Sequence, residues 1–288
     1  MQYDQPTTVD QAISLLAASG SSASLLAGGT DLLVQLRAGM RQPEHIVDVK
    51  RIPEMMTIAE NADGFLIGAA VPSAELNEHA ALKAAWPGVV EAMDLVGSTQ
   101  IQGRASLGGN ICNGSPAADS VPAMIAAGAI CTIAGPNGLR DIAVDDIVTG
   151  PGKTSLAADE ILVNIRLAPK QAGRGDAYLR MIPRTEMDIA VVGVGICLSI
   201  DEAGICTDAK VALGAVGPTQ IVLAEAEGIL VGTNVGDDAL ASLAAAASAA
   251  ATPIDDKRGT VSYRKKVTGV LAKRAAVIAL ERAGKSRS

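Results

Sequence analysis

Two pairs of adjacent glycines constrain this chain more than any other feature of its sequence. The first pair, Gly28-Gly29, lies between the apolar run 25–27 and a helix predicted over 32–38. The second pair, Gly108-Gly109, precedes a helix predicted over 123–127. Because glycine lacks a Cβ atom, it allows the backbone a sharp turn and a close approach to a ligand. The two turns therefore predict such an approach at two places in the fold.

These turns are candidates for binding a pyrophosphate. Adjacent glycines expose backbone N–H groups to an anion, and the N-terminus of a following helix adds partial positive charge worth about 0.3–1 kcal/mol. Thr30, Ser106 and Asn110 offer side-chain hydrogen bonds to the same group. Two such turns can hold the anion from opposite sides without a lysine, which suits an acidic protein. For either turn taken alone, a purely structural role is the more common explanation.

The order of the predicted elements indicates an α+β chain of more than one domain. Its 288 residues are about twice the usual ~150 of one domain. Helix and strand patterns alternate over the first part, whereas the last third has strands first and helices afterwards. The predicted helices cover 8–20, 32–38, 73–83 with Ser73 as its cap, 88–96, 123–127, 220–230, 237–251 and 263–283. The predicted strands cover 25–27, 46–49, 65–69, 129–134, 139–143, 160–167, 189–200 and 205–216.

Composition argues against several classes of function. Hydrophobic residues make up 49% of the chain, enough for a large core, whereas aromatic residues make up 2% and the net charge is -7. A chain with few stacking rings and an excess of acidic residues is not expected to bind nucleic acid. The polar start is unlike a signal peptide, and no stretch is apolar enough over ~20 residues to span a membrane. We therefore expect a cytoplasmic protein.

Metal and acid–base sites find little support in the residues. The four cysteines, at 112, 131, 197 and 206, have no CxxC spacing, so they predict reduced thiols and no metal site on this chain. Cys112 is predicted to be a buried small apolar residue. His45 and His79 are predicted to have solvated surface roles. Any redox chemistry is therefore expected to come from an organic cofactor.

Five short motifs, in the same order along the chain, carry a resemblance to a known family. They are Ala27-Gly28-Gly29-Thr30, Ser106-Leu107-Gly108-Gly109-Asn110, the continuation 111–119, Glu160-Ile161-Leu162 and Met187-Asp188-Ile189-Ala190. With these motifs, essentially the whole chain resembles the flavin-binding medium subunit of the molybdenum hydroxylases, the xanthine dehydrogenase and carbon monoxide dehydrogenase family. The resemblance implies an α+β fold: a two-subdomain FAD-binding domain of the vanillyl-alcohol-oxidase (PCMH) type, followed by a C-terminal α+β domain. The implied domains are 1–172, with subdomains of about 1–53 and 54–172, and 173–288.

The resemblance also implies a site for non-covalent FAD. The two glycine turns would hold the pyrophosphate, Asp119 would hydrogen-bond the cofactor near its ribityl–phosphate portion, and Leu162 would pack near the isoalloxazine. Arg180 falls where the family often carries a lysine near the flavin. The implied cofactor-binding residues are Ala27, Gly28, Gly29, Thr30, Asp31, Leu32, Ser106, Leu107, Gly108, Gly109, Asn110, Asp119, Leu162 and Arg180. No catalytic residue and no metal ligand is implied on this chain.

In function, the resemblance implies an electron-transfer subunit. Its FAD would take electrons from the [2Fe-2S] clusters of a small partner subunit and pass them to an external acceptor, while a large partner subunit oxidises substrate at molybdopterin. A dimer of heterotrimers is the implied assembly. Two alternatives stay open: a self-contained flavin-dependent oxidase of the same fold, and an interaction protein that has lost FAD.

Overall fold

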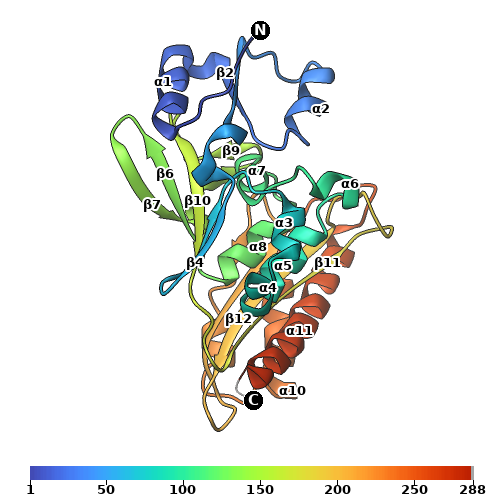
Figure 1. The fold of residues 1–288 in the computed structure, drawn as a ribbon. Coiled ribbons are helices and arrows are strands. Elements are labelled where there is room, and N and C mark those ends of the chain that lie inside the picture. Colours follow the sequence, from blue (N-terminus) through green and yellow to red (C-terminus); the bar gives the residue numbers. More distant parts are fainter. Residues whose placement is uncertain (287–288) are drawn as a thin grey trace.

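The computed structural model describes residues 1–286 of the chain, which form three layered units along its length (Figure 1). The first unit is a small three-stranded parallel sheet of order β1-β3-β2 with α1 beside it. Its elements are β1 (Gln2–Asp4), α1 (Val9–Ser19), β2 (Ala23–Leu26), α2 (Leu32–Arg37) and β3 (His45–Asp48). Thr8 caps α1, because its hydroxyl accepts a hydrogen bond from the Gln11 N–H at 3.2 Å, and Gly20 ends it at a φ of 53°.

The second unit is a five-stranded antiparallel sheet of order β4-β5-β10-β6-β7, accompanied by six short helices and a small hairpin. Its strands are β4 (Ile58–Asn61), β5 (Gly64–Gly68), β6 (Ile130–Gly135), β7 (Gly138–Ala143), β8 (Val148–Gly150), β9 (Lys153–Thr154) and β10 (Ile161–Leu167). Its helices are α3 (Ser73–Glu78), α4 (Ala80–Ala85), α5 (Pro87–Asp94), α6 (Thr99–Gln102), α7 (Leu107–Cys112) and α8 (Ser120–Ala126). Short 3-10 turns occupy Gly20–Ser22, Val49–Arg51, Pro53–Met55 and Val144–Asp146.

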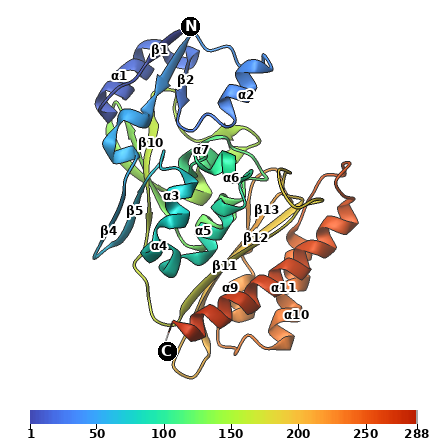
Figure 2. The same ribbon diagram turned by 45° about the vertical axis from the view of Figure 1, so that its right-hand side comes forward.

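The third unit is a four-stranded antiparallel sheet of order β11-β12-β13-β14 with three helices. Its elements are β11 (Arg174–Met181), β12 (Val192–Ile200), β13 (Cys206–Gly214), β14 (Ile221–Val222), α9 (Ala226–Leu230), α10 (Asp237–Ala250) and α11 (Val261–Lys285). Figure 2 shows α11 lying along this sheet, with α10 beside α11.

Small residues set how closely the third unit packs. A Cβ atom added to Gly175 on β11 would lie 2.1 Å from the carbonyl oxygen of Ala279 on α11. The next residue, Asp176, faces the opposite side of the sheet and meets α5. There α8 also packs closely, since a Cβ added to Gly195 would lie 2.4 Å from the oxygen of Pro122. The sheet is therefore covered by its own α11 on one face and by helices of the second unit on the other.

Several elements differ from their sequence-based prediction. The helix predicted over 73–83 is two helices, because His79 ends α3 and its Nδ1 caps α4 by accepting from the Leu82 N–H at 3.1 Å. Ser73 is not a cap: its buried hydroxyl donates to the Met93 carbonyl at 3.2 Å. The helix predicted over 220–230 is the short strand β14 followed by α9. His45 is buried, between Asp4 at 2.6 Å and Ser19 at 2.7 Å, so its predicted surface role is wrong.

Within residues 1–286, no helix combines the length and the apolar character needed to cross a membrane. The same residues contain no group of three or more His, Cys, Asp or Glu side chains arranged to hold a metal ion.

Candidate functional site

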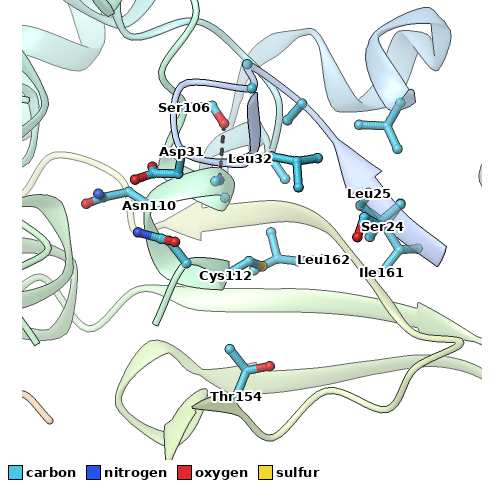
Figure 3. Close-up of a pocket in the computed structure, with 18 of the residues that line it drawn as sticks. Ser24, Leu25, Asp31, Leu32, Ser106, Asn110, Cys112, Thr154, Ile161 and Leu162 are labelled. Atoms are coloured by element: carbon cyan, nitrogen blue, oxygen red, sulfur yellow. Dashed lines mark hydrogen bonds between the residues drawn. The ribbon is translucent and has the colours of Figure 1, made fainter. Parts of the chain in front are cut away.

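A cavity of about 300 Å³ lies where the first unit meets the second, and both glycine turns line it (Figure 3). β2, the first turn and α2 form one wall, and α7, β9 and β10 supply much of the rest. This volume is at the lower end of the range of ligand pockets, about 300–1,000 Å³. Eleven of the fourteen implied cofactor-binding residues line it: Ala27, Gly28, Gly29, Thr30, Asp31, Leu32, Ser106, Gly108, Gly109, Asn110 and Leu162.

The first turn has free hydrogen-bond donors. Gly29 has a φ of 76°, a conformation that favours glycine. Among the described residues, no backbone N–H from Gly28 to Asp31 has an acceptor with hydrogen-bond geometry. Lys50 steadies the start of the turn, because its Nζ donates to the Ala27 carbonyl at 2.8 Å and to Asp48 at 2.7 Å. Successive unpaired N–H groups of this kind are suited to binding an anion.

The second turn differs from its prediction, because Gly108 and Gly109 lie in the first turn of helix α7, and their N–H groups are already used. The Gly108 N–H donates to the Ala69 carbonyl at 3.1 Å, and the Gly109 N–H donates to the Ser106 hydroxyl at 3.1 Å, the hydrogen bond drawn in Figure 3. A Cβ atom on Gly108 would lie 2.6 Å from Ala69. Leu107 is buried in the core and does not line the cavity. This turn therefore supplies a tightly packed wall rather than a second set of free donors.

Asn110 supplies a polar group from the second turn. Its Oδ1 accepts hydrogen bonds from the Ser120 N–H at 3.3 Å and from the Ser120 hydroxyl at 2.7 Å. These bonds fix the orientation of the amide, so its NH₂ group is left to donate to a ligand.

The charged groups that line the cavity are Asp31, Glu160 and Arg41. Glu160 is held by Arg140 through two hydrogen bonds of 2.8 Å, and these bonds lower the pKa of the Glu160 carboxyl. Loss of water around Asp31 raises the pKa of that carboxyl. Glu160 is thus already neutralised by its partner, whereas Asp31 and Arg41 have no ionic partner among the described residues.

Asp119 and Arg180 lie outside the cavity lining and bind each other. The Asp119 carboxylate accepts from the Tyr178 hydroxyl at 2.8 Å and from Arg180 Nη1 at 2.7 Å, and both charged side chains are buried. Burial raises the pKa of Asp119, and the charge of Arg180 opposes that rise. This pair joins the start of α8 in the second unit to β11 in the third.

Several residues that line the cavity were not among the implied cofactor-binding residues. They are Ser24 and Leu25 on β2, Arg41, Asn113, Thr154 and Leu156. Asn113 lies one helical turn beyond Gly109, a spacing from which it could have been found, and it accepts a hydrogen bond from Gln35 on α2 at 3.3 Å. Ser24 and Thr154 come from strands whose inward faces could not be assigned before the topology was known.

Cys112 differs from its prediction as a buried apolar residue. It is exposed and faces the cavity beside Leu162 (Figure 3). Desolvation within the cavity wall raises the pKa of its thiol to about 12. The group is therefore a neutral thiol at physiological pH.

The arrangement fits a flavin dinucleotide. The free N–H groups at 28–31 and the Asn110 amide could donate hydrogen bonds to a pyrophosphate, and the first turn is tightly packed, because a Cβ atom on Gly28 would overlap the Arg104 carbonyl oxygen. Leu25, Ile161 and Leu162 provide apolar surface for aromatic rings. Such a combination of a few placed polar groups in an apolar cavity is typical of cofactor sites.

Known proteins are similar to this chain in both sequence and fold. Residues 1–170 match the family of FAD binding domains in molybdopterin dehydrogenase, and residues 177–278 match the CO dehydrogenase flavoprotein C-terminal domain. The chain is 32% identical over 274 residues to the carbon monoxide dehydrogenase medium chain of Hydrogenophaga pseudoflava, covering 95% of each. It is 36% identical over 227 residues to a xanthine dehydrogenase FAD-binding subunit of Escherichia coli, covering 78% of this chain and 77% of that one.

The structural comparison agrees with the sequence comparison. The chain superposes on a chain of the Hydrogenophaga pseudoflava carbon monoxide dehydrogenase with a TM-score of 0.93 and 34% identity, covering 98% of both. It superposes on a chain of quinoline 2-oxidoreductase from Pseudomonas putida with a TM-score of 0.90 and 26% identity, covering 99% of this chain and 98% of that one. The α+β fold expected from the motifs is thereby confirmed.

Proposed function

This chain belongs to the family of FAD-binding medium subunits of the molybdenum hydroxylases, and from that premise we propose that it is an electron-transfer subunit carrying one non-covalent FAD. Bound FAD takes up and releases electrons one or two at a time, and the protein supplies binding, orientation and electrostatics. The observation that carries the proposal is the row of unpaired N–H groups at 28–31, which faces the same cavity as the rigid second turn.

In this proposal each wall of the cavity has a separate role. The N–H groups of the first turn and the Asn110 amide bind the pyrophosphate, and Ser106 keeps the second turn in shape by capping α7. Leu162 packs against the cofactor's ring system. We extend the proposal to Asp119 and Arg180, whose buried pair would act at the flavin from beyond the cavity lining.

We also propose the partners that such a subunit requires. A small subunit with [2Fe-2S] clusters would deliver electrons to the flavin, a large subunit with molybdopterin would oxidise substrate, and the flavin would reduce an external acceptor. The names of the relatives support this, since they describe a medium chain and a FAD-binding subunit. A dimer of heterotrimers in the cytoplasm, with domains of 1–172 and 173–288, completes the proposal.

The alternative is a self-contained flavin-dependent oxidase. It would need a group at the cavity that moves a proton. Glu160 is held ionised by Arg140 and Cys112 is held protonated, so Asp31 would be the candidate base. Turnover of substrate by this chain alone, abolished in an Asp31→Asn variant, would favour that alternative.

The test is the flavin content of the protein isolated natively, with every co-purifying chain retained. The proposal expects about one FAD per chain, released by acid without proteolysis, and molybdenum and iron in the same fraction. Flavin without molybdenum and iron would favour the oxidase. A stable native complex without flavin would contradict the proposal and favour an interaction protein.

A further inference from the structure

Arg41 is the one cationic side chain among the described residues that line the cavity. The other charged groups there are Asp31 and Glu160, and Glu160 is neutralised by Arg140. Arg41 is exposed, and its guanidinium has no hydrogen-bond or ionic partner within residues 1–286. The proposed ligand, a pyrophosphate, carries two negative charges. The free positive charge at the cavity is the guanidinium of Arg41.

The segment that bears Arg41, helix α2 with the residues that follow it to position 41, packs little against the rest of the protein. α2 buries none of its residues, and its Leu33 and Val34 side chains are 56% and 64% exposed. Gly29 and Gly39, with φ of 76° and 68°, flank the helix. Figures 1 and 2 show α2 standing away from the sheets, and the side-chain hydrogen bond that ties it to the second unit is the 3.3 Å bond from Gln35 to Asn113.

The backbone just after α2 places Arg41 at the cavity. The N–H groups of Met40 and Arg41 both donate to the Gln35 carbonyl, at 2.9 and 3.4 Å, so the chain turns back over the end of the helix. Residues Leu32, Gln35 and Arg41 of this segment line the cavity. The same segment thus begins at the free N–H groups of the first turn and ends at the guanidinium.

We propose that Arg41 is an ionic ligand of the cofactor's pyrophosphate, completing the first turn with the charge that the backbone donors lack. The inference rests on the proposed function, since it concerns how the same FAD is held. The planar guanidinium can donate two parallel hydrogen bonds to phosphate oxygens, which a lysine cannot. Because Arg41 is exposed, binding through its guanidinium is expected to weaken as salt is added.

The test compares Arg41→Ala with Arg37→Ala in the natively isolated protein, partners included. Arg37 is a matched control, because it is an exposed arginine on the same segment that does not line the cavity. FAD release after dilution is followed by the fluorescence of the freed flavin. We expect release about tenfold faster in Arg41→Ala, the effect of about 1.4 kcal/mol that a partly exposed charged hydrogen bond supplies. Arg41→Lys should fall between Arg41→Ala and the wild type, and Arg37→Ala should match the wild type.

Salt and folding controls separate the outcomes. Raising salt from about 50 mM to about 0.5 M should speed release from the wild type toward the Arg41→Ala rate and should change that variant little. Equal thermal melting of the two alanine variants shows that the difference is not one of folding. If Arg41→Ala releases FAD at the wild-type rate, the inference is wrong and the proposed function stands. If the wild-type complex carries no flavin, the proposed function itself fails.

Discussion

Gly28 packs directly on Arg104, so that a Cβ atom on Gly28 would lie 1.8 Å from the Arg104 carbonyl oxygen. Arg104 lies two residues before Ser106, where the second turn begins. The first turn therefore packs on the backbone that leads into the second turn, although 76 positions separate Gly28 from Arg104. The shape of the cavity depends on this contact, because it sets the distance between the row of free N–H groups and the wall opposite.

The contact predicts that Gly28→Ala will lose flavin and stability together. The added methyl group must push the first turn away from Arg104, and overpacking of this kind costs about 1–3 kcal/mol. Gly103→Ala is the matched control, because a Cβ atom at Gly103 meets nothing within 4 Å. Flavin content and thermal unfolding of the native complex check the prediction, which is wrong if the two variants behave alike.

How much of this site could be predicted depends on the range of the contacts. The first turn, the strands β12 and β13 and the helices α10 and α11 follow from local patterns in the chain, and all were predicted within a few residues. The second glycine pair was predicted as a turn, but it lies within α7. The pairing of the N–H groups in the second turn could not be predicted, because the Gly108 N–H donates to Ala69, which is distant in the sequence. Asp119 likewise pairs with Arg180, 61 positions away, and no local pattern encodes that pairing.

The burial of His45 also depends on a contact that is distant in the sequence. Its position before a strand suggested a solvated residue, yet β1 pairs with β3 and brings Asp4 to the imidazole at 2.6 Å. Strand β1 has only the residues Gln2–Asp4 and carries no clear alternation of apolar and polar side chains. An edge strand this short is defined by its partner rather than by its own sequence.

Asp176 predicts a pH dependence of stability at the junction of the second and third units. Burial raises its pKa to about 7, against the pull of Arg282, and its Oδ1 has no hydrogen-bond partner. The carboxyl of the unfolded chain ionises near pH 4, below the pKa in the folded state. The free energy of unfolding therefore falls as pH rises from about 4 to 7 and is constant above that. Asp176→Asn removes this pH dependence. We expect the free energy of unfolding of the variant, relative to that of the wild type, to increase by about 1–3 kcal/mol from pH 5 to pH 7.5.

Denaturant unfolding at several pH values measures that gain. Asp63→Asn serves as the control, because Asp63 is an exposed carboxylate away from the junction. A difference between Asp176→Asn and the wild type that is the same at pH 5 and pH 7.5 would contradict the prediction. Glu91 and Arg282, which pair with each other beside Asp176, stay unchanged in the variant.

Cys112 is predicted to be an unreactive thiol in spite of its exposure. With a pKa of about 12 it is almost wholly protonated at pH 7.5, and only the thiolate reacts rapidly. Alkylation by iodoacetamide, followed by mass spectrometry, should be about a thousandfold slower than for a free cysteine of pKa ~8.5. The rate should rise about tenfold per pH unit up to pH 9. Cys112→Ala should keep its full flavin content, since no bond to the cofactor is involved.

The buried pair of Asp119 and Arg180 predicts strong coupling in a double-mutant cycle. Arg180→Met leaves the Asp119 carboxylate buried with only Tyr178 as a side-chain partner, and loss of one member of a buried ion pair costs about 3–5 kcal/mol. Asp119→Asn keeps an acceptor for Tyr178 and removes the charge. The double variant should therefore recover most of the stability that Arg180→Met loses, as measured by denaturant unfolding.

Flavin content separates structural support from a direct role at the cofactor. If the pair only joins α8 to β11, the restored double variant should bind FAD as the wild type does, because the cavity lining is unchanged. If Asp119 or Arg180 acts at the flavin as we propose, the double variant should be stable but should release FAD faster or shift the flavin absorption spectrum. A stable double variant with wild-type release and spectrum would remove both residues from the cofactor site and leave the two turns as its framework.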